Sequence, residues 1–252
     1  DAEGSIWVGA NGGLYRLRET LFSSYTERDG LSGDYVRTVF EDRDRRLWVG
    51  SASGLDQQTA DGRFRPMVLH NRGGKAASVL SLAQDPGGDL WVGTFGDGVY
   101  RLRADGSLRH NYDAADGMPG GNIRAISVDP SGVVWAGTQK GVVRIDGDRV
   151  RVANTPGMPN GLITALEHDH QGNLWIGTIE GIRVLRGDHV QSIDLAPMGG
   201  GRSVFGFHQI GEAMWISSDR GLYRWYRNRL SRVGLEQGMP VDAVFQLVPD
   251  RL

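Results

Sequence analysis

The residues of this chain that could hold a metal ion are His168 and His170, which flank Asp169. Residues at positions i and i+2 of a β-strand share a face, so this pair would bind a metal if a third ligand joined it. We favour the simpler alternative, in which His168 packs on a strand and His170 lies in an exposed turn. The other histidines are isolated (His70, His110, His189 and His208). The sequence therefore predicts no metal centre and no cofactor.

Aspartates recur at one fixed distance before a tryptophan. Asp1, Asp42, Asp85, Asp129 and Asp169 each stand six residues ahead of one. A short carboxylate at such a place accepts backbone N–H bonds from the turn that follows, which is a structural role. The chain also has no nucleophile elbow, no glycine-rich phosphate loop and no cysteine. We therefore expect no catalytic residues and do not expect an enzyme.

The tryptophans themselves mark an internal repeat. Six of them are separated by 41, 43, 44, 40 and 40 residues, namely Trp7, Trp48, Trp91, Trp135, Trp175 and Trp215. A period in this range is typical of the blades of a β-propeller, each of which takes about 40–50 residues. Six copies in one register predict tryptophans buried between blades.

The fourth repeat shows how a blade forms. Short runs rich in β-branched residues cover 123–128, 133–138, 142–146 and 149–154, with Gly, Pro, Asp or Ser in the turns between them. Four strands in meander order make an antiparallel sheet that must be covered by neighbouring sheets. The predicted fold is all-β: one β-propeller domain over residues 1–252, with four-stranded antiparallel blades and six repeats.

The sequence leaves two alternatives for how the ring of blades closes. Residues 241–250 could supply an inner strand that closes the first blade, which Trp7 begins. Alternatively, the chain is a fragment of a seven-bladed propeller.

Composition excludes several partners. The formal net charge of −2 gives no electrostatic footprint for nucleic acid or for an anionic membrane. The absence of cysteine is compatible with an oxidising compartment. No stretch approaches the roughly 20 apolar residues that a membrane span needs.

The repeat resembles the two-component regulator propeller repeat. The resemblance rests on Gly30-Leu31-Ser32, Gly117-Met118-Pro119, Gly157-Met158-Pro159 and Gly238-Met239-Pro240, and on the segment Asp169 to Thr178 (DHQGNLWIGT). Two positions depart from the pattern, since Ile210 replaces the aspartate and Ser217 replaces the glycine. The resemblance implies a periplasmic sensor region of a hybrid histidine kinase or of a GGDEF diguanylate cyclase, anchored in the membrane and able to dimerise through the full-length receptor.

We expect ligands to bind where loops lead into the first strands and where second strands turn into third strands, because these loops converge on one face of a propeller. Arg37, Arg124 and Arg202 could pair bidentately with a carboxylate or a sulfate, or could instead be solvated or paired with aspartates. The expected ligand is a small molecule or an oligosaccharide, with anionic ones among the candidates. The predicted ligand-binding residues are Tyr35, Arg37, Asn122, Arg124, Asn160, Thr164, Arg202, Asp242, Lys140 and Arg220.

Two other functions compete with sensing. Streptogramin lyases are propellers with a similar tryptophan-bearing repeat and a metal-assisted histidine site, for which His168 and His170 are the candidates here. A propeller that only docks other proteins is the third possibility. Sialidases are excluded, because their motif places the aspartate two residues before glycine whereas Asp129 precedes Gly132 by three.

Overall fold

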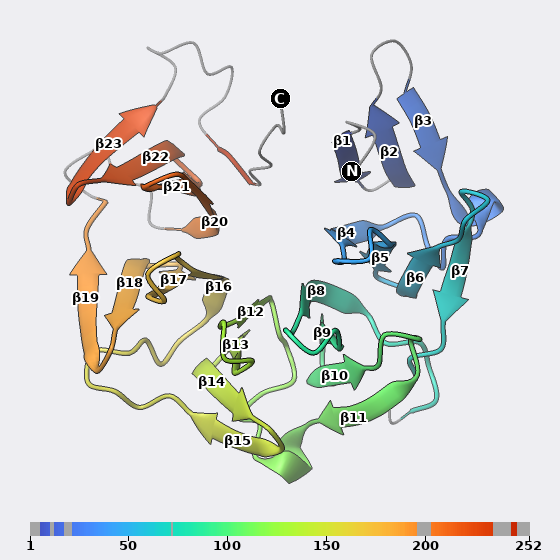
Figure 1. The fold of residues 1–252 in the computed structure, drawn as a ribbon, viewed down its shortest axis with the longest axis horizontal. Coiled ribbons are helices and arrows are strands. Elements are labelled where there is room, and N and C mark those ends of the chain that lie inside the picture. The colour runs from blue at the N-terminus through green and yellow to red at the C-terminus, as the bar shows by residue number, and fades with distance from the viewer. Residues whose placement is uncertain are drawn as a thin grey trace. The chain divides into compact units, whose positions relative to one another are not determined.

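The computed structural model describes residues 6–10, 13–17, 22–71, 73–195, 203–233 and 243–245, with side chains from Ser24 onward. Apart from two 3-10 turns, its regular structure is all antiparallel β (Figure 1). The chain divides into two units, 1–123 and 124–252.

Unit 1 holds three sheets. The first contains β1 (Ile6–Ala10), β2 (Gly13–Leu17) and β3 (Phe22–Tyr25). The second contains β4 (Val36–Glu41), β5 (Leu47–Ser51), β6 (Gly54–Gln58) and β7 (Phe64–Met67). The third contains β8 (Val79–Gln84), β9 (Leu90–Thr94), β10 (Val99–Leu102) and β11 (Leu108–Tyr112).

Unit 2 holds three more sheets of four strands. The first contains β12 (Ala125–Val128), β13 (Val134–Thr138), β14 (Gly141–Asp146) and β15 (Arg149–Val152). The second contains β16 (Ile163–His168), β17 (Leu174–Thr178), β18 (Gly181–Arg186) and β19 (His189–Ile193). The third contains β20 (Val204–Ile210), β21 (Ala213–Ser218), β22 (Gly221–Tyr226) and β23 (Arg229–Val233).

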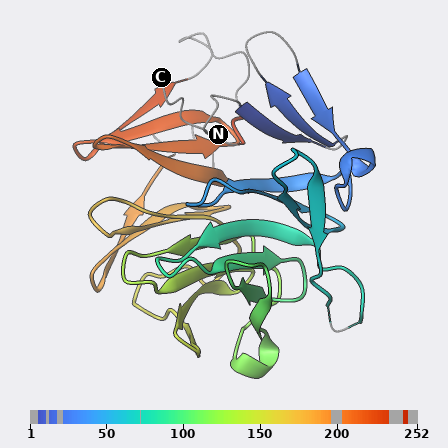
Figure 2. The ribbon, with the colours of Figure 1, turned by 45° about the vertical axis from the view of Figure 1, so that its right-hand side comes forward.

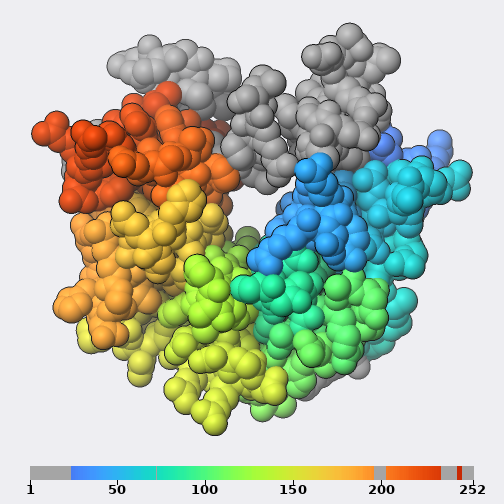
Figure 3. Space-filling view, viewed as in Figure 1, coloured from blue at the N-terminus to red at the C-terminus, as the bar shows by residue number. Residues whose placement is uncertain are grey.

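These sheets are the blades of a β-propeller, as the repeat predicts. Strands within each sheet follow one another in chain order, so every blade is a meander. Within unit 1, β4 contacts both β1 and β8, and within unit 2, β16 contacts both β12 and β20. First strands therefore lie next to first strands, which places them on the inner side of the blades. Figure 3 shows the β4–β7 and β8–β11 blades packed along a continuous face.

Glycine makes this close packing possible. A Cβ atom added to Gly137 in β13 would lie 2.6 Å from Cγ2 of Ile163 in the next blade. A methyl group there would overlap the neighbouring side chain, so the sequence keeps hydrogen at this position. Gly50 and Gly177 make the same close approach, since an added Cβ would lie 2.5 Å from Cγ1 of Val79 and 2.9 Å from Cγ1 of Val204.

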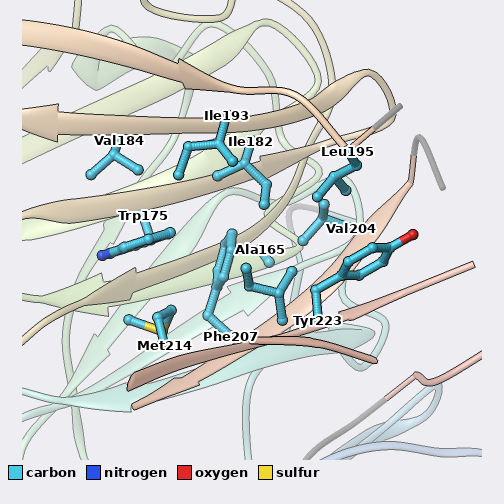
Figure 4. Close-up of a cluster of buried hydrophobic side chains, with 11 residues drawn as sticks. Ala165, Trp175, Ile182, Val184, Ile193, Leu195, Val204, Phe207, Met214 and Tyr223 are labelled. Carbon is cyan, nitrogen blue, oxygen red and sulfur yellow. The ribbon is translucent and has the colours of Figure 1, made fainter. Parts of the chain in front are cut away.

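The hydrophobic core lies between consecutive blades. In unit 2, Trp175 packs between Val184 and Met214, with Phe207 beside it (Figure 4). The centroids of the Trp175 and Phe207 rings are 5.9 Å apart. Side chains from the β16–β19 and β20–β23 blades interdigitate here, so neither blade has a core of its own.

The prediction that every repeat tryptophan is buried is only partly right. Trp48, Trp91 and Trp175 are buried, whereas Trp135 and Trp215 are only partly buried. The indole N–H of Trp135 has no hydrogen-bond partner among the described residues. The side chain of Trp7 lies outside the described residues.

Two short 3-10 turns, which the sequence did not predict, precede first strands. They are η1 (Glu27–Asp29) and η2 (Ala114–Asp116), and each is closed by a capping box and by a left-handed glycine, Gly30 or Gly117. Figure 2 shows η2 as a separate green turn beyond the end of β11.

The predicted closing strand, 241–250, lies outside the described residues except for 243–245. The Val244 N–H donates to the Ser218 carbonyl over 2.9 Å, and the Ile123 N–H donates to the Thr94 carbonyl in the same way over 2.8 Å. Both acceptors end the second strand of a blade, and Ile123 stands two residues before β12, the first strand of the next blade. Val244 thus makes the same backbone hydrogen bond as Ile123, a residue that leads into the first strand of a blade.

Candidate functional site: a pocket beside the β9–β10 turn

The turns between second and third strands share one design, and the β9–β10 turn departs from it. Four of these turns have two residues between a Ser or Thr and a Gly, and the second residue donates its N–H to the Ser or Thr oxygen. These residues are Ser53, Lys140, Glu180 and Arg220, at 2.9–3.1 Å from Ser51, Thr138, Thr178 and Ser218. The β9–β10 turn has three residues, Phe95, Gly96 and Asp97.

The extra residue opens the turn toward the next loop. Gly96 and Gly98 both donate N–H bonds to the Gly121 carbonyl, over 3.1 and 3.0 Å. Asp97 bulges between them, and no hydrogen bond ties its backbone N–H to Thr94 in the described structure. A Cβ on Gly121 would lie 2.2 Å from the Gly96 carbonyl oxygen, so the two backbones touch here only because Gly121 has no side chain.

A pocket of about 200 Å³ lies between this turn, the end of β11 and the loop that follows η2. Its polar side chains are Asp97, Asn111 and Asp113. Its apolar side chains are Ala114, Met118 and Pro119, and the remaining lining is glycine backbone at 96, 98, 120 and 121. All of these residues belong to unit 1.

The fold holds the lining residues in defined positions. Asn111 lies on β11, opposite Tyr100 of β10. Asp113 accepts the Ala115 N–H over 2.8 Å as the N-cap of η2, and its own carbonyl accepts the Met118 N–H over 3.0 Å. Met118 is buried. The capped turn therefore fixes both the polar and the apolar wall.

The pocket has a negative potential. Burial raises the pKa of the Asp97 carboxyl above its ordinary value of 3.8. Burial, together with the charges of Asp97 and Asp113, raises the pKa of Tyr100 to about 12. The Tyr100 hydroxyl donates to the His70 carbonyl over 3.0 Å, so its proton is engaged in a hydrogen bond within the fold.

Two acceptor groups of the pocket have no partner among the described residues. The Asn111 Oδ1 atom is buried without a hydrogen bond. The Asp97 carboxylate has neither a hydrogen bond nor an ion pair to any described side chain or backbone group. The described residues that line the pocket include no histidine, serine, lysine or arginine.

The histidine pair does not form a metal site in the described structure. His168 Nδ1 lies 2.8 Å from the Ser127 hydroxyl of the neighbouring blade. Burial lowers the pKa of His168 below 6.5, although Asp129 and Asp169 oppose this shift. His170 is exposed, and its backbone N–H donates to Gln209 over 2.7 Å. No three His, Cys, Asp or Glu side chains within the described ranges converge as a metal site would require.

The residues predicted to bind ligand occupy varied environments. Tyr35 and Arg37 are exposed, and the Arg37 guanidinium lies 5.3 Å from the centroid of the Tyr35 ring. The Thr164 hydroxyl donates to the Val204 carbonyl over 2.5 Å, a contact between blades. Arg202 and Asp242 lie outside the described residues. Of the others, Asn122 is partly buried and immediately follows the pocket, while Arg124, Lys140, Asn160 and Arg220 are exposed.

Sequence reasoning missed Asp97, Asn111 and Asp113 as a group. The detectable signal was the three-residue turn, which makes the 44-residue interval between Trp91 and Trp135 the longest of the five. Length alone did not show that Asn111, fourteen positions further along the chain, would face the same space.

Comparison with known proteins agrees with the repeat. The family model described as Two component regulator propeller matches residues 30–53, 73–96, 117–140 and 157–180. The chain carries two component regulator propeller repeats. The pocket is lined by the end of the second matched repeat, the start of the third and the segment that joins them. No curated protein matches the chain by sequence.

Solved structures share the fold of these repeats. One is the extracellular domain of a protein described as the hybrid two component system BT4673 from B. thetaiotaomicron, with 21% identity and a TM-score of 0.81 over 94% of this chain and 36% of that one. Another is the corresponding domain of BT3049, with 18% identity and a TM-score of 0.82 over 99% and 36%. The chain thus spans about a third of the length of these domains.

A lyase also shares the fold. The structure of a catalytically inactive virginiamycin B lyase from Staphylococcus aureus with quinupristin has 15% identity and a TM-score of 0.78, over 94% of this chain and 83% of that one.

Proposed function

We propose that the chain is a non-catalytic, ligand-binding sensor region of a bacterial signal-transduction protein and that it lies outside the cytoplasm. The four matched repeats carry this proposal. The fold shared with two extracellular domains of hybrid two component systems supports it. None of the helices in the described ranges is long and apolar enough to cross a membrane. The proposal includes a full-length protein with a membrane anchor and an output domain, either a kinase or a GGDEF cyclase.

The site supports binding without turnover. The pocket beside the β9–β10 turn offers acceptor oxygens and an apolar wall, and its described lining has no His, Ser, Lys or Arg side chain. His168 would be the central ligand of a lyase-like metal site, but its Nδ1 atom lies within hydrogen-bond distance of the Ser127 hydroxyl. Exposed arginines at positions 37 and 124 remain candidates for a second, anionic ligand such as an acidic oligosaccharide.

The catalytic alternative has a direct test. The chain is incubated with quinupristin and Mg²⁺, and the antibiotic is followed by mass spectrometry. We expect quinupristin to be recovered unchanged. Linearisation of the peptide that is lost in His168→Ala would overturn the non-catalytic assignment and favour a lyase.

The extracytoplasmic position can be tested by cysteine labelling, because the chain has no cysteine of its own. Asp188→Cys places a thiol on an exposed turn between β18 and β19 of the full-length protein. A membrane-impermeant maleimide should label it in intact spheroplasts as fully as in lysed cells. The parent protein is the control for thiols elsewhere, and labelling only after lysis would contradict the proposed position.

A further inference from the structure

We propose that Asn160 is a site of spontaneous covalent modification, at which the side-chain amide is lost and aspartate and isoaspartate are formed. Asn160 is followed by Gly161 in the loop that leads into β16. The inference concerns the chemistry of the chain itself and does not depend on the proposed sensor function.

The reaction has two steps. The backbone nitrogen of Gly161 attacks the Cγ atom of Asn160, the Cγ–Nδ2 bond breaks, and ammonia leaves with the proton of that N–H group. Water then adds to one of the two carbonyl carbons of the resulting five-membered imide and opens the ring. Addition at Cγ gives aspartate, whereas addition at the backbone carbonyl gives isoaspartate, in which the main chain runs through Cβ and Cγ.

The first observation is that the reacting peptide unit is free. Asn160 and Gly161 are both exposed. Within the described residues, no hydrogen bond uses the Gly161 N–H or the Asn160 carbonyl, and the Asn160 side chain has no partner. The attacking nitrogen can therefore lose its proton to solvent, and the side chain can turn toward it without breaking an interaction.

The second observation is the space around Gly161. A side chain on the attacking residue hinders ring closure, and glycine has none. A Cβ atom added at Gly161 would meet no heavy atom within 4 Å, so the surrounding fold does not press on this residue either. The loop has room for the change of conformation that ring closure requires.

Related pairs elsewhere in the chain are held by the fold. Asn173 precedes Leu174 of β17, and its Nδ2 atom donates to Asp169 Oδ2 over 2.8 Å. Aspartate followed by glycine could close the same ring, but in five such pairs the glycine N–H donates a backbone hydrogen bond, at Gly30, Gly62, Gly98, Gly106 and Gly117. The tertiary environment of Asn160 therefore distinguishes it from these sites. The other Asn-Gly pair, Asn11–Gly12, lies outside the described residues.

The modification would change the surroundings of the β13–β14 turn. The Gly161 carbonyl accepts the Gly141 N–H over 2.9 Å, and a Cβ atom added at Gly141 would lie 3.4 Å from the Asn160 Cα atom. Isoaspartate inserts one methylene group into the main chain directly before this contact. It also adds a negative charge next to the turn that carries Lys140. The loop that leads into β16 thus changes in both length and charge.

The test follows the 252-residue chain during incubation in neutral buffer at physiological temperature. Tandem mass spectrometry locates each converted asparagine, and fragmentation between Cα and Cβ distinguishes isoaspartate from aspartate. We expect Asn160 to convert at a rate within roughly tenfold of that in the unstructured peptide 155–165, with isoaspartate as the major product. Asn173 should stay intact over the same time.

Variants identify the attacking group. Gly161→Ala keeps Asn160 and adds a methyl group for which the fold has room, so conversion should slow by roughly tenfold or more. Asn160→Gln would need a six-membered ring and should stay intact. Asn11→Gln removes the other Asn-Gly pair and should leave the conversion of Asn160 unchanged. Circular dichroism confirms that each variant is folded.

Three results would overturn the proposal. One is an Asn160 that stays unconverted in the folded chain while the peptide 155–165 reacts, which would show that the fold protects it. Another is aspartate as the only product, which indicates direct hydrolysis of the amide without the imide. The third is an unchanged rate of conversion in Gly161→Ala.

Discussion

The indole N–H of Trp48 donates a 2.9 Å hydrogen bond to Oδ2 of Asp42, six residues earlier in the chain. The Oδ1 atom of the same carboxylate accepts the N–H groups of Asp44 and Arg46, both over 2.9 Å. One side chain therefore closes the turn between the first two strands and also anchors the buried indole. Trp91 and Trp175 make the same bond, to Asp85 and Asp169 over 3.0 Å.

Removing the Asp42 carboxylate should lower the free energy of unfolding more than removing a repeat carboxylate that closes only its turn. Asp129 accepts the Ser131 and Val133 N–H groups, but the Trp135 indole N–H has no partner. We expect Asp42→Ala to destabilise the chain by about 2–4 kcal/mol, because it leaves the Trp48 N–H buried and unpaired. Asp129→Ala should cost about 1–2 kcal/mol. Urea unfolding measures both, and equal losses would contradict a special role for the indole bond.

Replacing a tryptophan should destabilise the chain more when the side chain is more deeply buried. Trp175 is buried in the core between two blades, and Trp135 is partly exposed. Trp175→Ala should destabilise the chain by about 3–5 kcal/mol, since it leaves a large cavity. Trp135→Ala should cost clearly less. A similar loss of melting temperature for both would show that burial does not decide the cost.

A mostly buried carboxylate, that of Glu167, should make stability depend on pH. Burial raises the pKa of Glu167 from 4.5 to about 7, and no hydrogen-bond or ion-pair partner is present among the described residues. The folded state therefore holds the proton more tightly than the unfolded state, and stability falls as the pH rises from about 4.5 to 7.

Replacing Glu167 by glutamine should remove this effect. At about pH 8, Glu167→Gln should be more stable than the parent by up to about 3 kcal/mol, while at about pH 4 the two should be alike. Chemical denaturation across this pH range measures the difference. Glu180→Gln, at an exposed turn, is the control and should show no such trend. A gain that does not depend on pH would show that charge is not its cause.

The contact at Gly137 gives a test of blade packing. Gly137→Ala would place a methyl group 2.6 Å from Ile163 Cγ2. We expect a loss of about 1–3 kcal/mol from overpacking. A methyl group added at Gly161 would meet no atom within 4 Å, and Gly161 has no positive φ, so Gly161→Ala should be neutral or slightly stabilising. Thermal unfolding compares the two, and a neutral Gly137→Ala would mean that the blades can move apart at little cost.

The amino-acid sequence by itself determined the blade. The tryptophan period, the turn residues and the alternation of short apolar runs predicted four antiparallel strands per repeat, and the strands observed at 125–128, 134–138, 141–146 and 149–152 agree within two residues at each end. These are local features, because strand alternation and turn chemistry involve neighbours in the chain. The turn role of the repeat aspartates was predictable for the same reason.

Tertiary structure alone decided which polar groups meet. Of the predicted arginines, Arg37 lies on β4 and Arg124 stands just before β12, whereas Asp97, Asn111 and Asp113 line one pocket beside the three-residue β9–β10 turn, which is hydrogen-bonded to Gly121. Likewise, His168 was predicted to pack on a strand, but its Ser127 partner lies 41 residues away in the neighbouring blade. Contacts between blades depend on how sheets stack, and no periodicity within one repeat specifies which side chains then face each other.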